Sequence, residues 1–286
     1  MSDNAPIAEA KARSLIKEWE IIDPHEIDLE SIALDLGIYI KESSIQGSAA
    51  RLICLGDTAV ITVNKDIPEA GRKRFGIAHE IGHFVLHRSK SQVKVCTEEH
   101  FLEWYKGSVD EKEASIFASE LIMPSEIFQR YCKGKSPSID SIIKLSRDFN
   151  TSISATAIRF VKYSNRPCAI IASCEKKIIW YAKSDNFDYW IVPIGTEVHK
   201  YSCAFDYFST GRVPDKAEVV NGIAWMEDID KGKNVYFYEQ ALAMPNYATV
   251  LSLIWVKEDN NVYDNEHYES KLDPNKFTPD GKRYRW

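Results

Sequence analysis

Residues 75–87, FGIAHEIGHFVLH, decide the fold of this chain because they join the pattern H-E-x-x-H to an apolar stripe at helical spacing. His79 and His83, four residues apart, lie together along the edge of that stripe, and Glu80 lies just beyond them. Two imidazoles one helical turn apart can bind one zinc ion, and the adjacent carboxylate can reach the water on that ion. The stretch therefore predicts a metal site on a helix. The alternative is a chance arrangement on a solvated helix.

A second helix, residues 110–124 (DEKEASIFASELIMP), supplies candidates for a third ligand. Its apolar face is followed by Pro124, which ends the helix. On a helical wheel Glu111 lies about 60° from the centre of the apolar face, whereas Glu113 lies about 100° away on the other side. We therefore predict Glu111 as the third ligand and a solvated position for Glu113, which is the reserve candidate. For both residues, the alternative is a carboxylate that is favoured at the helix N-terminus by the helix dipole.

The composition indicates a globular protein. The chain has 286 residues, of which 44% are hydrophobic, so it can bury a sizeable core and is long enough for about two domains. Its formal net charge of −6 argues against a protein that coats nucleic acid, although a local basic surface stays open.

The cysteines and the apolar runs indicate a cytoplasmic protein. The six cysteines form no C-x-x-C pattern, which favours reduced thiols over a disulfide framework. Residues 1–10 lack the basic start and the apolar run of a signal peptide. The longest strongly apolar stretch, residues 248–256, is too short to cross a membrane.

Before the motif helix, apolar periodicity predicts two helices and then three short strands. These cover residues 6–20, 27–36, 38–40, 50–55 and 59–63. Gly56 and Asp57 turn the last two strands into a hairpin. A helix, a small sheet and an H-E-x-x-H helix form the minimal order of a zincin-type metallopeptidase. We therefore predict an α+β chain in which residues 1–132 form a zincin-like domain.

Residues 133–166 differ in charge from the rest of the chain. They contain seven Lys/Arg and two Asp, which gives +5 in a chain of −6. Periodicity predicts helices at 138–149 and 152–163, joined by Asn150 and Thr151, and the pair looks like a helix-turn-helix. Because basic helices are often only solvated faces, a spacer or partner-binding module is favoured over DNA binding.

From residue 167 the pattern changes to strands, which predicts a β-rich domain over residues 167–257. The expected strands cover residues 168–172, 177–182, 190–194, 217–224, 234–239 and 249–257. The tryptophans of this half favour a core rather than a ligand site. Residues 258–286 are polar and predict a loosely held C-terminal tail.

The connection between the two motif helices, residues 88–109, is polar and long enough to cover the metal site. Cys96 and His100 within it are candidate metal donors, although their spacing favours a buried thiol and a surface histidine.

Two motifs, in this order, resemble the ImmA/IrrE family of metallo-endopeptidases. They are R-x-R-F-x-x-A-H-E-x-G-H-F-x-L-H over residues 72–87 and E-x-x-A-x-x-F-A-x-E-L-x-M-P over residues 111–124. The resemblance covers residues 6 to about 130. Some members of the family have a sensor-like module after this part, which would correspond to residues 167–257. Members of the family are zinc peptidases that cleave a helix-turn-helix repressor and so derepress phage, mobile-element or DNA-damage genes.

By this resemblance the metal ligands are His79, His83 and Glu111, and the catalytic glutamate is Glu80. It implies a zinc-dependent regulatory endopeptidase whose protein substrate is a helix-turn-helix transcriptional repressor. The alternative is a non-catalytic regulator that binds DNA or a repressor and holds a structural metal. The sequence does not indicate the oligomeric state or the residue that stabilises the oxyanion.

The chain also departs from the family pattern. Ser115 replaces a usual asparagine and Gly76 a usual threonine, which bears on substrate fit rather than on the metal. His87 matches a family position that is not a ligand. The glycine of the longer metzincin motif is missing as well, so we expect His87 to be a helix-end residue.

Overall fold

The computed structural model describes residues 5–55, 57–87, 108–227, 229 and 235–256, and the backbone of residues 93–94. The chain divides into two compact units. Unit 1 comprises Met1–Tyr131 and Lys144–Ile153, and unit 2 comprises Cys132–Ile143 and Ser154–Trp286. Residues 133–166 are therefore shared between the units, and the domain boundaries drawn from the sequence stay a prediction.

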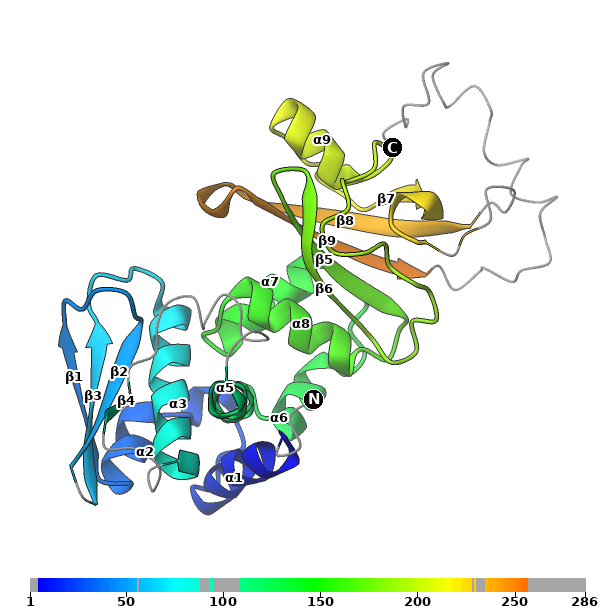
Figure 1. The fold of residues 1–286 in the computed structure, drawn as a ribbon. Helices are drawn as coiled ribbons and strands as arrows, with labels where there is room; N and C mark the ends of the chain where they lie inside the picture. The colour runs from blue at the N-terminus through cyan, green and yellow to red at the C-terminus, as the bar shows by residue number, and fades with distance from the viewer. Residues whose placement is uncertain are drawn as a thin grey trace, which may run out of the picture. The chain divides into compact units, whose positions relative to one another are not determined.

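Unit 1 is a small sheet with helices beside it (Figure 1). The strands are β1 (Ile38–Ser43), β2 (Ala50–Leu55), β3 (Thr58–Asn64) and β4 (Val93–Lys94). The helices are α1 (Ala5–Glu18), the 3-10 helix η1 (Pro24–Glu26), α2 (Leu29–Asp35), α3 (Ala70–His87), α5 (Val109–Ile122) and α6 (Ser125–Cys132), which ends at the unit boundary. The strand order is β1-β3-β2-β4, and the antiparallel pair β2–β3 is the predicted hairpin.

The core of unit 1 lies where α3 packs against β2 and β3 and where α5 packs against both α3 and α1. Ile81 of α3 and Phe117 and Leu121 of α5 are fully buried there. Because each such side chain stabilises the fold by about 1.5–3 kcal/mol, this apolar contact fixes α5 against α3.

Helices α7 (Ile139–Asp148) and α8 (Ile153–Tyr163) lie where the sequence predicts them. Asn150 between them has a φ of 49°, a left-handed conformation that ends α7. Both helices bury apolar residues, among them Leu145 and Phe160. Use of the pair as a helix-turn-helix stays a prediction.

Unit 2 is built on an antiparallel sheet with the strand order β6-β5-β9-β8-β7 (Figure 1). Its strands are β5 (Cys168–Cys174), β6 (Lys177–Lys183), β7 (Glu218–Asn221), β8 (Tyr236–Met244) and β9 (Thr249–Val256). Its other elements are α9 (Cys203–Thr210), which packs against β8 and β9, and the 3-10 helices η2 (Gly222–Ala224) and η3 (Pro245–Tyr247).

The sequence predictions for unit 2 were wrong in three places. Residues 190–194 form no strand but contribute one isolated bridge, between Ile191 and Met226. The strand expected over 217–224 ends at Asn221, whose side chain accepts a hydrogen bond from the Ile223 N–H and so begins η2. Trp190, expected in the core, is 69% exposed.

Helix α9 was missed because its sequence, CAFDYFST, has no long apolar period. Its start does carry a signal, the Ser202 hydroxyl, which accepts a hydrogen bond from the Phe205 N–H.

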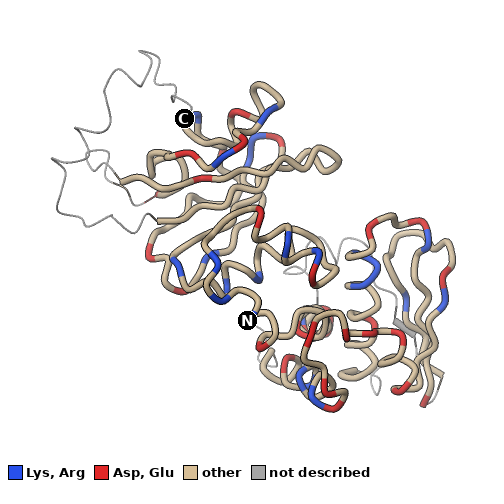
Figure 2. The backbone as a smooth tube through the Cα atoms, turned by 180° about the vertical axis from the view of Figure 1, so that it is seen from behind, with Lys and Arg blue, Asp and Glu red and all other residues tan. Residues whose placement is uncertain are grey.

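The mixed α+β class, with a small N-terminal sheet, a helical middle and a β-rich C-terminal part, is confirmed. Lys/Arg and Asp/Glu both occur along the backbone of each unit (Figure 2). Within the described ranges, no helix has the length and apolarity that a membrane-spanning segment needs. Cys96, His100 and the expected tail 258–286 lie outside the described residues.

Candidate metal centre

Gly82 lets α3 and α5 approach closely enough to share a site. A Cβ atom at this position would lie 3.0 Å from Cδ1 of Phe117 and 3.1 Å from the carbonyl oxygen of Ala114, both on α5. The first turn of α5 is fixed in turn by Ser108, whose hydroxyl accepts a hydrogen bond from the Glu111 N–H at 3.4 Å. The glycine and the cap together bring the side chain of Glu111 to the histidines of α3.

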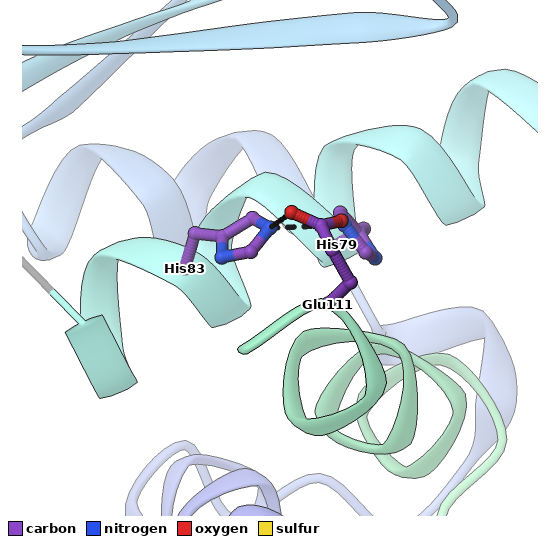
Figure 3. Close-up of side chains that lie close together, drawn as sticks. All are labelled: His79, His83 and Glu111. Carbon is purple, nitrogen blue, oxygen red and sulfur yellow. Dashed lines mark hydrogen bonds and ion pairs between the residues drawn. The ribbon is translucent and has the colours of Figure 1, made fainter. Parts of the chain in front are cut away.

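His79, His83 and Glu111 converge as the sequence predicts (Figure 3). His79 Nε2 lies 3.1 Å from Glu111 Oε2, and His83 Nε2 lies 3.2 Å from Glu111 Oε1. The two Nε2 atoms are 3.1 Å apart. Both imidazoles are buried, whereas the Glu111 side chain keeps 12% of its surface exposed.

The spacing of these donor atoms fits one metal ion. Atoms bound tetrahedrally to zinc at about 2.0–2.1 Å lie about 3.3–3.4 Å from one another, and the closest separations here are 3.1, 3.1 and 3.2 Å. The chemistry of the set agrees, because two imidazole nitrogens that face each other need a proton or a cation between them. An anionic carboxylate beside them stabilises positive charge at this point, whether it is a proton or a metal ion.

Residues 33–161 match the model of the peptidase M78 family, the IrrE N-terminal-like domain. The chain carries an IrrE-like domain. The resemblance to the ImmA/IrrE family is therefore confirmed for these residues, and the peptidase family whose model they match implies a metal ion.

Among solved structures, a Mycobacterium tuberculosis transcriptional regulator is similar to this chain with a TM-score of 0.53 and 15% sequence identity. The similarity covers 90% of this chain and 77% of the mycobacterial one. At this identity the likeness concerns the fold alone. A comparison with curated proteins found no match.

In the IrrE-like domain, Glu111 is held in its charged form. Burial raises the pKa of its carboxyl group, but hydrogen bonds with His79 and His83 outweigh burial and hold that pKa below its ordinary value. A carboxylate that stays ionised near neutral pH is available to bind a cation.

The other ring nitrogens of the two histidines also have hydrogen-bond partners in the IrrE-like domain. His79 Nδ1 lies 3.3 Å from the hydroxyl of Ser115, and His83 Nδ1 lies 3.2 Å from Nδ1 of His87. His87 Nε2 in turn lies 2.9 Å from Glu113 Oε2. Such partners fix the tautomer and the orientation of a metal-binding imidazole.

The position of Glu113 corrects the sequence prediction. A solvated side chain was expected, but Glu113 is only 5% exposed. The wheel of α5 places it away from the centre of that helix's own apolar face, yet His87, the last residue of α3, covers it. The four-residue spacing from His83 to His87, which places both on one face of α3, is the signal that could have revealed this contact.

Glu80, the predicted catalytic residue, lies on α3 directly after His79 and is fully buried. It follows His79 directly in the sequence, which is the basis of the prediction. Its catalytic role stays a prediction.

Proposed function

We propose that this chain is a zinc-dependent endopeptidase that cleaves a protein partner, with a helix-turn-helix transcriptional repressor as the expected class. The observation that carries the proposal is the convergence of His79, His83 and Glu111 from two helices, with donor atoms 3.1–3.2 Å apart. The metallopeptidase family model supports it. The name of the structural neighbour, a transcriptional regulator, is compatible with a regulatory role.

In the proposed reaction His79 and His83 would hold the ion through Nε2 and Glu111 would hold it through its carboxylate. A zinc ion bound there would polarise the scissile carbonyl and would lower the pKa of a water molecule toward about 7. The Glu80 carboxylate accepts a proton from a water molecule while the oxygen of that water bonds to the carbonyl carbon. Glu80 then delivers the proton to the leaving nitrogen as the carbon–nitrogen bond breaks. The products are an amine and a carboxylic acid, which loses the second water proton to solvent and becomes a carboxylate.

The test uses Glu80→Gln, which keeps the size of the side chain but removes the base. The variant should bind zinc as the wild type does and slow cleavage by about 10²–10⁴-fold. Glu126→Gln is the matched control, because Glu126 is exposed on α6. It should retain full activity.

The substrate for this test comes from co-purification with Glu80→Gln, which should hold its partner without cutting it. The captured protein is identified by mass spectrometry and incubated with zinc-loaded wild type, and the fragments are mapped. A partner that stays intact would contradict the endopeptidase proposal. A partner that both proteins cut at one rate would contradict the role of Glu80.

A second candidate function is DNA or repressor binding with a structural metal. The observation that favours it is the +5 charge of residues 133–166, in which Lys144 and Arg147 are exposed on α7. Arg159 on α8, in contrast, is only 7% exposed and lies against the Tyr163 ring.

Salt dependence tests this second function. If α7 contacts phosphates, a double replacement of Lys144 and Arg147 by Gln should reduce the slope of log K against log salt by about 2, roughly 0.9 per lost phosphate contact. An unchanged slope, or no DNA binding by the wild type, would contradict the DNA-binding form of this function.

A further inference from the structure

A chain of buried polar groups runs from the candidate metal centre into the contact between α3 and α5. It passes from His83 to His87 through their Nδ1 atoms, 3.2 Å apart, and from His87 Nε2 to Glu113 Oε2 at 2.9 Å. All three side chains are buried. The predicted reaction uses neither His87 nor Glu113, so their burial beside a ligand calls for an explanation.

The protons of this chain can be assigned from geometry. A histidine that binds a metal through Nε2 must carry its proton on Nδ1. The Nδ1–H of His83 then points to His87, whose Nδ1 must accept it. His87 therefore carries its own proton on Nε2, where the Glu113 carboxylate accepts it. Each of the two hydrogen bonds then has one donor and one acceptor, and the second ends on an anion that needs no proton.

We propose that His87 and Glu113 are positioning residues that hold His83 in the tautomer and orientation required for metal binding. The inference rests on the proposed zinc centre and deepens it. Charge-assisted hydrogen bonds are about twice as strong as neutral ones. The Glu113 carboxylate therefore fixes the orientation of the His83 ring, through His87, more strongly than the orientation of the His79 ring is fixed. The partner of His79 Nδ1 is the neutral hydroxyl of Ser115, at 3.3 Å.

A competing assignment is a second metal site, because His87, Asp110 and Glu113 also place donor atoms within 4.8 Å of one another. A metal on His87 Nε2 would move the His87 proton to Nδ1. His83 Nδ1 would then have to accept the hydrogen bond from His87, so the proton of His83 would move to Nε2. With a proton on Nε2, His83 could no longer bind the first ion. While the Nδ1–Nδ1 contact persists, the two sites exclude each other. One ion per chain follows.

The experiment measures zinc affinity by competition with a chelator, starting from the metal-free full chain. His87→Phe keeps a ring without nitrogen atoms, and Glu113→Leu keeps a branched side chain without an acceptor. Both should weaken zinc binding by about 10–100-fold, the usual effect of losing such a partner. Glu113→Gln retains an acceptor oxygen and should recover part of the loss, whereas Ser115→Ala should cost less than either.

The controls separate positioning from general damage. Glu126→Leu, on the exposed face of α6, should bind zinc as the wild type does. Thermal melting of each metal-free variant reports loss of fold independently of the metal. Histidine ¹⁵N spectra of the zinc-loaded wild type should show His83 protonated on Nδ1 and His87 protonated on Nε2, a pattern that packing alone does not impose.

Each way of failing has its own signature. Wild-type protein that binds no zinc would overturn the proposed function and this inference with it. If the wild type binds zinc and His87→Phe binds it with the same affinity, the positioning role is overturned and the proposed metal centre stands. Two zinc ions per chain, with His87 protonated on Nδ1, would assign His87, Asp110 and Glu113 to a second metal site instead.

Discussion

Each unit contains a carboxylate in a buried network, and the two networks differ in what completes them. In unit 2, Glu239 is fully buried and accepts hydrogen bonds from the Cys203 N–H at 3.0 Å, Trp225 Nε1 at 2.9 Å and the Ser252 hydroxyl at 2.8 Å. In unit 1, Glu111 faces two imidazoles whose Nε2 atoms also face each other at 3.1 Å.

The difference lies in the partners. Amide, indole and hydroxyl donors satisfy a carboxylate by themselves, and those around Glu239 also anchor the first turn of α9 to β8. Imidazole nitrogens of α3 bring lone pairs as well as protons, so the Glu111 network can take up a cation. A buried glutamate alone therefore does not indicate a metal site, whereas a glutamate among imidazoles makes a candidate for one.

The largest effect should come from replacing the two glutamates in parallel. Glu111→Gln should weaken zinc binding by more than about 100-fold, because loss of an outer partner alone costs about 10–100-fold. Glu239→Gln should leave zinc affinity unchanged. Chelator competition on both proteins is the measurement. Equal zinc affinities in the two variants would remove the distinction between the networks.

The reciprocal effect is on stability. Glu239→Ala leaves the donors of Trp225, Cys203 and Ser252 buried without their acceptor, at about 1–3 kcal/mol for each unsatisfied group. We expect the free energy of unfolding to fall by at least about 3 kcal/mol in urea titrations. Loss of less than about 1 kcal/mol would mean that water replaces the carboxylate.

Sequence alone predicts which three side chains converge better than it predicts the residues packed behind them. The positions of His79, His83 and Glu111 can be predicted from helical spacing and a helical wheel, because each of these patterns concerns a single helix. Glu113 does not, because its burial depends on where the neighbouring helix ends and on the His87 side chain that lies there.

Unit 2 shows the same limit. Glu239 looks like an ordinary strand residue until its pairing within the sheet and the position of α9 are known. Residues 190–194 have the composition of a strand, but they pair only at the single bridge of Ile191. Local patterns specify elements, whereas long-range contacts decide which polar side chains become buried.

A smaller effect should follow from separating α3 and α5. Gly82→Ala places a methyl group 3.0 Å from the Phe117 ring and should cost about 1–3 kcal/mol of stability, the usual range for overpacking. It should also weaken zinc binding, because Glu111 moves with α5. Gly76→Ala is the control on the same helix: its Cβ would meet Ala49 and Ala50 at 3.4 Å, an ordinary contact. Equal zinc affinities in both variants would contradict the close-approach role of Gly82.

The smallest effect concerns Asp23, a carboxylate near the surface of unit 1, in contrast to Glu111 and Glu239 in their buried networks. A hydrogen bond donated by the Tyr131 hydroxyl at 2.7 Å, followed by one from the His25 N–H, lowers the pKa of Asp23. The same contact raises the pKa of Tyr131 to about 12. Because the folded-state pKa of Asp23 is depressed, its contribution to stability is present above the unfolded pKa and is lost as pH falls through the folded one. Tyr131→Phe should raise the pKa of Asp23 toward its ordinary value in an NMR titration while zinc affinity stays constant. If the pKa of Asp23 does not change in Tyr131→Phe, the hydrogen bond from the His25 N–H is sufficient to keep that pKa low.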